Sequence, residues 1–172
     1  MAMDLASFIR DIPDFPEPGI MFKDITPLLG SPSAFDYALD QMMVPYEGID
    51  VDYVAGIESR GFILAAPLAV RMDAGHVPIR KPGKLPSKVE RIEYALEYGT
   101  DALEVHVDAV QPGSTVVIAD DVMATGGTAA AAVELMNRLG AHVVGLSVLI
   151  ELSFLEGRSK LSGVEIHSLI TY

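Results

Sequence analysis

Two stretches of the chain repeat one pattern: an apolar run rich in β-branched residues, a segment of helical character, and a second apolar run. The first stretch reads DYVAGI, SRGFILAAPLAVRM and HVPIR, and the second reads TVVIAD, TAAAAVELMNRLG and HVVGLSVLIE. Continuous apolar runs are typical of strands that are covered on both faces, as in parallel sheets. The alternation of strands and helices therefore predicts an α/β fold, with a mostly parallel twisted sheet flanked by helices.

Two other regions depart from this pattern. Residues 11–30 contain four prolines and two glycines, which predicts an ordered but irregular lid rather than a core element. Residues 81–100 are charged and begin with a stretch of proline and glycine, and loops of this length in compact domains are usually functional or disordered. The second half of this region, residues 92–96, could pair as a strand or a ribbon.

Composition excludes several classes of function. The 172-residue chain has a formal net charge of −12 and no cysteine. The absence of cysteine excludes disulfides, thiolate metal sites and a thiol nucleophile. The negative charge argues against a nucleic-acid partner, and no apolar run is long enough to span a membrane. The first residues lack the long apolar core of a signal peptide, so we expect a cytoplasmic protein.

The basic residues are unevenly distributed. Five of the 12 fall within one stretch, called here the basic segment (residues 80–91), namely Arg80, Lys81, Lys84, Lys88 and Arg91. Such charge runs are most often solvated loops. An acidic protein with one basic segment can nevertheless bind a small, highly charged anion there.

The string VVIADDVMATGGT, residues 116–128, carries the clearest chemical signal. Asp120 and Asp121 end an apolar strand, and parallel sheets bind ligands beyond the C-terminal ends of their strands. The small residues that follow open a helix, whose first N–H groups and dipole favour a phosphate. Two carboxylates would repel that phosphate unless they face the hydroxyl groups of a ribose. The alternative is a plain turn in which the two glycines serve only the backbone.

We therefore predict a site for a sugar 5-phosphate. Asp120 and Asp121 are the expected ribose-binding residues. The expected phosphate-binding residues form the segment called here the phosphate loop, namely Ala124, Thr125, Gly126, Gly127 and Thr128. No Gly-Lys-Ser/Thr follows, and G-x-G-x-x-G is absent, so neither a Walker loop nor a dinucleotide fingerprint is present.

This string resembles the signature of the type I phosphoribosyltransferases, which bind 5-phosphoribosyl 1-diphosphate. Three further stretches resemble the adenine-specific members of that family: DFPEPGIMFKDITPLL, AGIESRGFILAAPLA, and IRKPGKLP followed by LEYGTDALEVHVDAV. They occur in the family's order and cover nearly the whole chain. The resemblance implies a single domain over residues 1–172, with a small hood or lid at 1–32 and an α/β core at 33–172 that includes a mobile flap at 81–100.

The resemblance also implies which residues bind the diphosphate. They are Glu58, Ser59, Arg60, Arg80, Lys81 and Lys84, with a cis peptide bond near Glu58–Ser59 and with basic groups that can come from the partner in a homodimer. A guanidinium can bind a diphosphate through two parallel hydrogen bonds, whereas an ammonium acts as a point charge. From the pattern alone, Ser59 could instead cap the helix that follows.

The remaining implied roles concern the base. Met21, Phe22 and Lys23 would surround adenine, with Phe22 stacked on the ring or, alternatively, buried in a local hydrophobic cluster. Lys23 stands where the family commonly has arginine, so a bidentate contact is not available there. Glu97 would be the general acid/base at the purine N7, with Arg60 as the second catalytic residue, and Tyr98 would help to close the flap.

The implied activity is a step of purine salvage, the transfer of the 5-phosphoribosyl group from its diphosphate to adenine, giving AMP and pyrophosphate. Mg²⁺ is expected on substrate oxygens and water rather than on direct protein ligands. Two alternatives stay open. One is a related transferase acting on xanthine or hypoxanthine, and the other is a regulatory protein that has kept the ribosyl-diphosphate site without catalysis.

Overall fold

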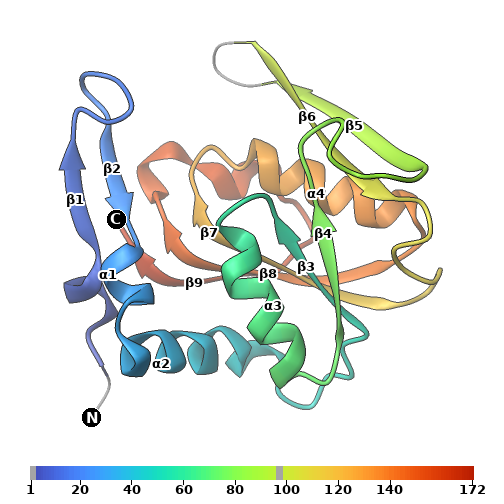
Figure 1. Ribbon diagram of the computed structural model, residues 1–172, viewed down its shortest axis with the longest axis horizontal. Coiled ribbons are helices and arrows are strands. Elements are labelled where there is room, and N and C mark those ends of the chain that lie inside the picture. Colours follow the sequence, from blue (N-terminus) through green and yellow to red (C-terminus); the bar gives the residue numbers. More distant parts are fainter. Residues whose placement is uncertain (1–2, 96–98) are drawn as a thin grey trace. The chain divides into compact units, whose positions relative to one another are not determined.

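The computed structural model in Figure 1 describes residues 3–95 and 99–172. The chain divides into two compact units, Met1–Gln41 and Met42–Tyr172. Within the described residues, no helix is both long and apolar enough to cross a membrane.

The first unit contains an antiparallel hairpin and short helices. Its elements are the 3-10 helix η1 (Leu5–Phe8), β1 (Arg10–Pro13), β2 (Met21–Asp24), α1 (Thr26–Leu29) and α2 (Pro32–Met43), the last of which continues into the second unit. The prediction of irregular structure over residues 11–30 was therefore wrong in part, because the segment includes two paired strands and a short helix. Asp14 and Gly19 both have positive φ, and the Asp14 carboxylate accepts a hydrogen bond of 2.7 Å from the Gly19 N–H. This turn chemistry lets a proline-rich segment connect two paired strands.

The second unit holds a five-stranded parallel sheet in the order β4-β3-β7-β8-β9 and an antiparallel ribbon, β5-β6. This arrangement confirms the predicted α/β class. Its elements are η2 (Val44–Tyr46), β3 (Tyr53–Ile57), α3 (Gly61–Arg71), β4 (Gly75–Ile79), β5 (Val89–Ala95), β6 (Thr100–His106), β7 (Thr115–Met123), α4 (Gly127–Arg138), β8 (His142–Glu151), η3 (Ser153–Leu155), η4 (Gly157–Lys160) and β9 (Ile166–Thr171).

The strand order creates a switch point between β3 and β7. From β3 the chain passes through α3 to β4 on one side, and from β7 it passes through α4 to β8 on the other. Because such crossovers are right-handed, α3 and α4 cover opposite faces of the sheet. The crevice at a switch point is where α/β sheets bind ligands.

The core of the second unit fixes this geometry. Ile57, Leu64, Ile118 and Leu146, from β3, α3, β7 and β8, are almost completely buried. Burial of each such side chain contributes about 1.5–3 kcal/mol. The strands therefore hold the loops at their C-terminal ends on a rigid base.

β7 is longer than the sequence pattern predicted. Its pairing with β3 ends at Ala119, whereas its pairing with β8 continues to Met123. Asp120 and Asp121 thus lie within β7 but beyond its pairing with β3. At these two residues, the edge of β7 next to the β3–α3 connection is not paired with β3.

Candidate active site

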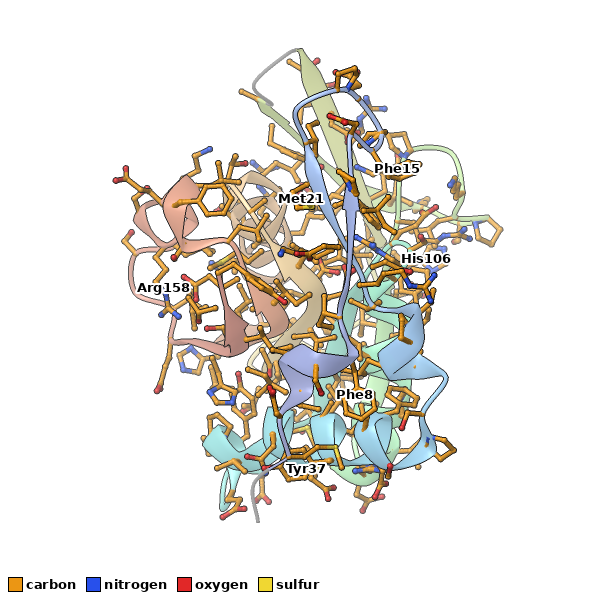
Figure 2. All side chains as sticks on the ribbon, turned by 90° about the vertical axis from the view of Figure 1, so that its left-hand side faces the viewer. Phe8, Phe15, Met21, Tyr37, His106 and Arg158 are labelled. Atoms are coloured by element: carbon orange, nitrogen blue, oxygen red, sulfur yellow. The ribbon has the colours of Figure 1, made fainter. Side chains whose placement is uncertain are left out.

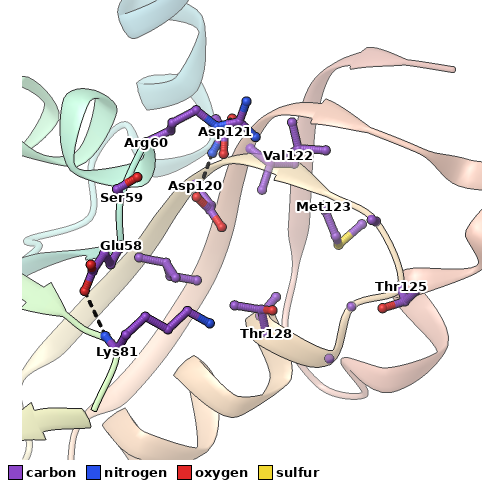
Figure 3. Close-up of a pocket in the computed structure, with 16 residues that line it drawn as sticks. Glu58, Ser59, Arg60, Lys81, Asp120, Asp121, Val122, Met123, Thr125 and Thr128 are labelled. Carbon is purple, nitrogen blue, oxygen red and sulfur yellow. Dashed lines mark hydrogen bonds and ion pairs between the residues drawn. The ribbon is translucent and has the colours of Figure 1, made fainter. Parts of the chain in front are cut away.

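A pocket of about 350 Å³ lies beside the C-terminal ends of β3 and β7 (Figure 3). It is formed by the β3–α3 connection, the end of β7, the phosphate loop and one residue of the basic segment. Its lining consists of Ile57, Glu58, Ser59, Arg60, Lys81, Val148 and all ten residues from Asp120 to Ala129. The structure therefore brings together most of the predicted ribose, phosphate and diphosphate residues.

The phosphate loop presents open backbone groups at the start of α4. Gly126 is the N-cap residue, with φ of +77°, and no side chain caps the helix. Intrahelical bonding begins with the Ala130 N–H, which donates to the Gly126 carbonyl at 2.9 Å. The N–H groups of the first turn and the positive end of the helix dipole are thus suited to an anion.

A distant glycine, Gly157, supports this loop. A Cβ on Gly126 would lie 2.2 Å from the Gly157 carbonyl oxygen, and one on Gly157 would lie 2.4 Å from the Ala124 carbonyl oxygen. The neighbouring Arg158, labelled in Figure 2, holds Glu151 through hydrogen bonds of 2.7 and 2.6 Å. No local signal marks Gly157, because its partners lie far away in the sequence.

The two aspartates face the other side of the pocket. Arg60 Nε lies 2.7 Å from Asp121 Oδ2, an ion pair without the angles of a hydrogen bond, and Asp120 Oδ1 accepts the Asp121 N–H at 2.9 Å. α3 can approach this closely because a Cβ on Gly61 would be 2.7 Å from Asp120 Oδ1.

The charge state of the pair follows from this placement. Burial raises the pKa of Asp120 well above its usual value, and the neighbouring charge of Asp121 raises it further. Burial also raises the pKa of Asp121, although the Arg60 guanidinium opposes that effect. Two carboxylates in this setting favour a ligand that brings hydroxyl donors or developing positive charge.

Glu58 organises the basic segment. Its nearly buried carboxylate accepts hydrogen bonds from the Lys81 N–H at 2.8 Å, from Arg80 Nε at 3.3 Å, and from the Lys84 ammonium. Burial raises the pKa of Glu58, but these partners, Lys84 first among them, more than offset it and hold the pKa below its usual value. The side chains of Arg80 and Lys84 are therefore held at the edge of the pocket by their ion pairs with the Glu58 carboxylate.

The Glu58–Ser59 peptide bond is cis, as the resemblance implied. α3 begins at Gly61 with Arg60 as its N-cap residue and with no side-chain cap. The alternative interpretation of Ser59 as the helix cap is therefore wrong.

The three residues expected around adenine lie in β2, in the first unit. Met21 is 48% exposed, and Phe22 packs edge-on against Phe15, with ring centroids 5.1 Å apart (Phe15 and Met21 are labelled in Figure 2). Lys23 Nζ lies 2.7 Å from Asp11 Oδ1. Glu97 and Tyr98 fall outside the described residues, so their expected roles stay predictions.

An open parallel sheet with an uncapped helix start and paired carboxylates at its switch point is typical of α/β proteins that bind phosphorylated ligands. The family model described as "Phosphoribosyl transferase domain" matches residues 46–165, well over half of the sequence. The chain belongs to the phosphoribosyltransferase family.

Individual relatives span nearly the whole chain. The adenine phosphoribosyltransferase of Thermobifida fusca (strain YX) is 58% identical over 164 residues, which cover 95% of this chain and 93% of that protein. The crystal structure of the same-named enzyme from Thermoanaerobacter pseudethanolicus is 51% identical, with a TM-score of 0.95 and 98% of each chain covered. The Saccharomyces cerevisiae enzyme, complexed with adenine and an imino-altritol bisphosphate, is 39% identical, with a TM-score of 0.92 and 96% of each chain covered.

Proposed function

We propose that this chain transfers the 5-phosphoribosyl group from 5-phosphoribosyl 1-diphosphate to adenine, giving AMP and pyrophosphate in purine salvage. The observation that carries the proposal is the uncapped start of α4 beside the Asp120–Asp121 pair at the switch point of the sheet. Relatives that share more than half of their residues with this chain are named for that activity.

In this proposal, the phosphate loop binds the 5-phosphate through main-chain N–H groups, with the Thr125 and Thr128 hydroxyl groups as further donors. Asp120 and Asp121 accept hydrogen bonds from the ribose hydroxyl groups. Positive charge builds on the ribose ring as the diphosphate leaves, and the two nearby carboxylates favour that transition state. Their partial burial strengthens the effect, because the field is less screened than in water.

The departing diphosphate is bound on the opposite side of the pocket. We assign it to Arg60 and to the backbone around Glu58 and Ser59, with Arg80 and Lys84 supplied by the basic segment. Arg60 can act in two ways, since it contacts Asp121 and can also stabilise charge on the leaving group. The Glu58 carboxylate would itself repel the diphosphate. We therefore propose that it orients the cationic side chains of Arg80 and Lys84 instead.

Magnesium fits this site when it is carried by the substrate. Asp121 is engaged by Arg60 and Asp120 by a main-chain N–H, so diphosphate oxygens and water are the natural ligands. Bound there, Mg²⁺ offsets negative charge on the leaving group.

For the base, we retain Met21, Phe22 and Lys23 as the adenine-binding residues. The exposure of Met21 and the edge-on packing of Phe22 leave apolar surface for a purine. Glu97 is the proposed acid/base at N7, and Tyr98 the proposed flap residue. A homodimer, implied by family resemblance, and a cytoplasmic location complete the proposal.

The test is a base-specificity assay. The purified chain is incubated with 5-phosphoribosyl 1-diphosphate, Mg²⁺ and either adenine, hypoxanthine, guanine or xanthine, and the nucleotide formed is quantified by chromatography. We expect AMP as the dominant product, with little product from an Arg60→Ala control at equal concentration. Preference for another base, or no nucleotide at all, would contradict the proposal.

A further inference from the structure

An ion pair connects the ends of β8 and β9 to the segment that follows β8, called here the supporting segment (residues 153–160). Arg158 donates from Nε to Glu151 Oε1 at 2.7 Å and from Nη2 to Glu151 Oε2 at 2.6 Å. Its Nη1 donates to the Ile166 carbonyl at 3.1 Å, and Ser168 Oγ donates to Glu151 Oε2 at 2.7 Å. Two parallel bonds between a guanidinium and a carboxylate fix both the distance and the orientation of the pair.

The carboxylate end of the pair lies beside the strand from which the phosphate loop departs. Glu151 is the last residue of β8 and is paired with Met123, the last residue of β7. The Leu152 N–H donates to the Met123 carbonyl at 2.9 Å. The phosphate loop begins at the next residue, Ala124. This end of the ion pair is therefore fixed to the sheet at the base of the loop.

The guanidinium end of the pair adjoins the residue that touches the loop. Gly157, which precedes Arg158, is buried, and a Cβ on it would lie 2.4 Å from the Ala124 carbonyl oxygen and 3.0 Å from the Gly126 nitrogen. The backbone of Gly157 is thus in direct contact with the phosphate loop at two positions. The groups that hold Gly157 in place also limit how far the loop can move.

The ion pair is the strongest polar restraint on the supporting segment. Phe154 and Leu155 are 70% and 39% exposed, and the next fully buried apolar side chain, that of Leu161, lies beyond the segment. The Glu151 side chain is only 6% exposed, whereas that of Arg158 is 51% exposed. Hydrogen bonds from Arg158 hold the pKa of Glu151 below its usual value despite burial. A nearly buried, ionised carboxylate is costly without its cation, so the pair holds the segment to the sheet.

We propose that Glu151 and Arg158 are positioning residues for the 5-phosphate, whose ion pair holds Gly157 against the phosphate loop and so keeps the N–H groups at the start of α4 aligned for the anion. Neither side chain lines the active-site pocket. This inference rests on the proposed function, because it needs a ligand whose 5-phosphate occupies the loop. A loop that is held in place beforehand loses less conformational freedom when the phosphate binds.

A pair of ligands isolates the contribution of the loop. AMP and adenosine differ only in the 5-phosphate, so the ratio of their dissociation constants reports on phosphate binding. Both constants are measured by ligand-observed NMR titration, which detects weak binding, for the wild-type chain, Arg158→Met and Arg158→Lys. Arg138→Met is the matched control, because Arg138 forms an exposed ion pair with Glu134, of 3.0 Å, at the end of α4 away from the loop.

We expect Arg158→Met to weaken AMP binding about tenfold, as for the loss of one charged hydrogen bond, and adenosine binding less than about twofold. Arg158→Lys keeps a cation beside Glu151 but not the two parallel hydrogen bonds, so AMP binding should weaken about threefold. Arg138→Met should change neither constant.

Three results would overturn the inference: equal losses for AMP and adenosine in the Arg158 variants, unchanged AMP binding in both of them, or a loss in Arg138→Met as large as that in Arg158→Met. The first result would mark a purely structural role. If Arg158→Met did not fold, Arg158→Lys would decide, because it leaves no unpaired buried carboxylate. If the wild-type chain bound AMP no more tightly than adenosine, the proposed function itself would fall, and this inference with it.

Discussion

In our proposal, the phosphate loop and the basic segment bind the same substrate, but they do so with different chemical groups. The loop offers main-chain N–H groups, held in place by the contact of Gly126 with Gly157. The basic segment offers side-chain cations, and each of Arg80, Lys81 and Lys84 is paired with a carboxylate. The first is preorganised by packing, whereas the second is organised by charges that the substrate must share or displace.

The phosphate loop is therefore the rigid part of the site, and the basic segment is the adaptable part. Close contacts between backbones leave no room for adjustment, because interiors are densely packed. Ion pairs near a surface contribute only about 0–1 kcal/mol, and the side chains of Arg80 and Lys84 are 34% and 47% exposed. Changes in the loop should therefore have large effects, and changes in the basic segment smaller and more graded ones.

The largest effect is expected for Gly126→Ala. The new Cβ would collide with Gly157 in addition to the unfavourable positive φ, so the loop must shift and we expect kcat/KM for the phosphoribosyl donor to fall about 100-fold or more. Steady-state kinetics with adenine and the donor provide the measurement. Gly113→Ala is the control, because Gly113 also has positive φ but its Cβ would meet nothing within 4 Å. Similar losses in both variants would show that backbone angle, not the Gly157 contact, decides.

A second large effect is expected for Asp120→Asn. The folded-state pKa of Asp120 is raised, so its contribution to stability is fully present below its usual value of 3.8 and is lost as the pH rises through the folded-state pKa. At neutral pH the amide should therefore increase the free energy of unfolding, while kcat falls about tenfold or more. Urea denaturation at several pH values checks this, and the stability gain should shrink toward acidic pH. A loss of stability at neutral pH would contradict the raised pKa of Asp120.

An intermediate effect is expected for Glu58→Gln. The basic segment loses its charged partner, so KM for the donor should rise about threefold to tenfold, while AMP binding at the phosphate loop changes less than about twofold. Because the pKa of Glu58 is lowered, its stabilising effect is present above 4.5 and is lost as the pH falls through the folded-state value. Wild type and variant should thus converge in stability in acid. Glu47→Gln, on an exposed residue, is the control. Equal weakening of AMP would contradict the separation of the two regions.

The smallest effect is expected for Lys88→Ala. Lys88 is exposed, and its backbone carbonyl, which accepts the Val107 N–H at 3.1 Å, is retained in the variant. KM for the donor should stay within about twofold of wild type. Lys84→Ala in the same assay should raise KM more, since its ammonium is paired with Glu58 beside the pocket. If Lys88→Ala had the larger effect, total charge rather than pairing would control binding.

The parallel α/β class and the strand, loop and helix over residues 115–138 could be predicted from the sequence alone. These depend on residues adjacent in the chain: an apolar run specifies β7, and Gly126 supplies the positive φ at which α4 begins. Local hydrogen bonding and the alternation of apolar segments are encoded within a few residues, so a linear pattern reveals them. The hairpin over residues 10–24 escaped prediction because its prolines masked the pairing of β1 with β2.

The groups that face one another across the site could not be predicted in the same way, because they come from separate segments of the chain. Gly157 beneath the phosphate loop and Glu58 among the basic side chains join segments far apart in the sequence. Their residue types carry no signal of these contacts, since a glycine or a glutamate has many possible neighbours. A side chain's charge and contacts depend on its neighbours in the folded chain. The order of strands in the sheet determines which residues become neighbours.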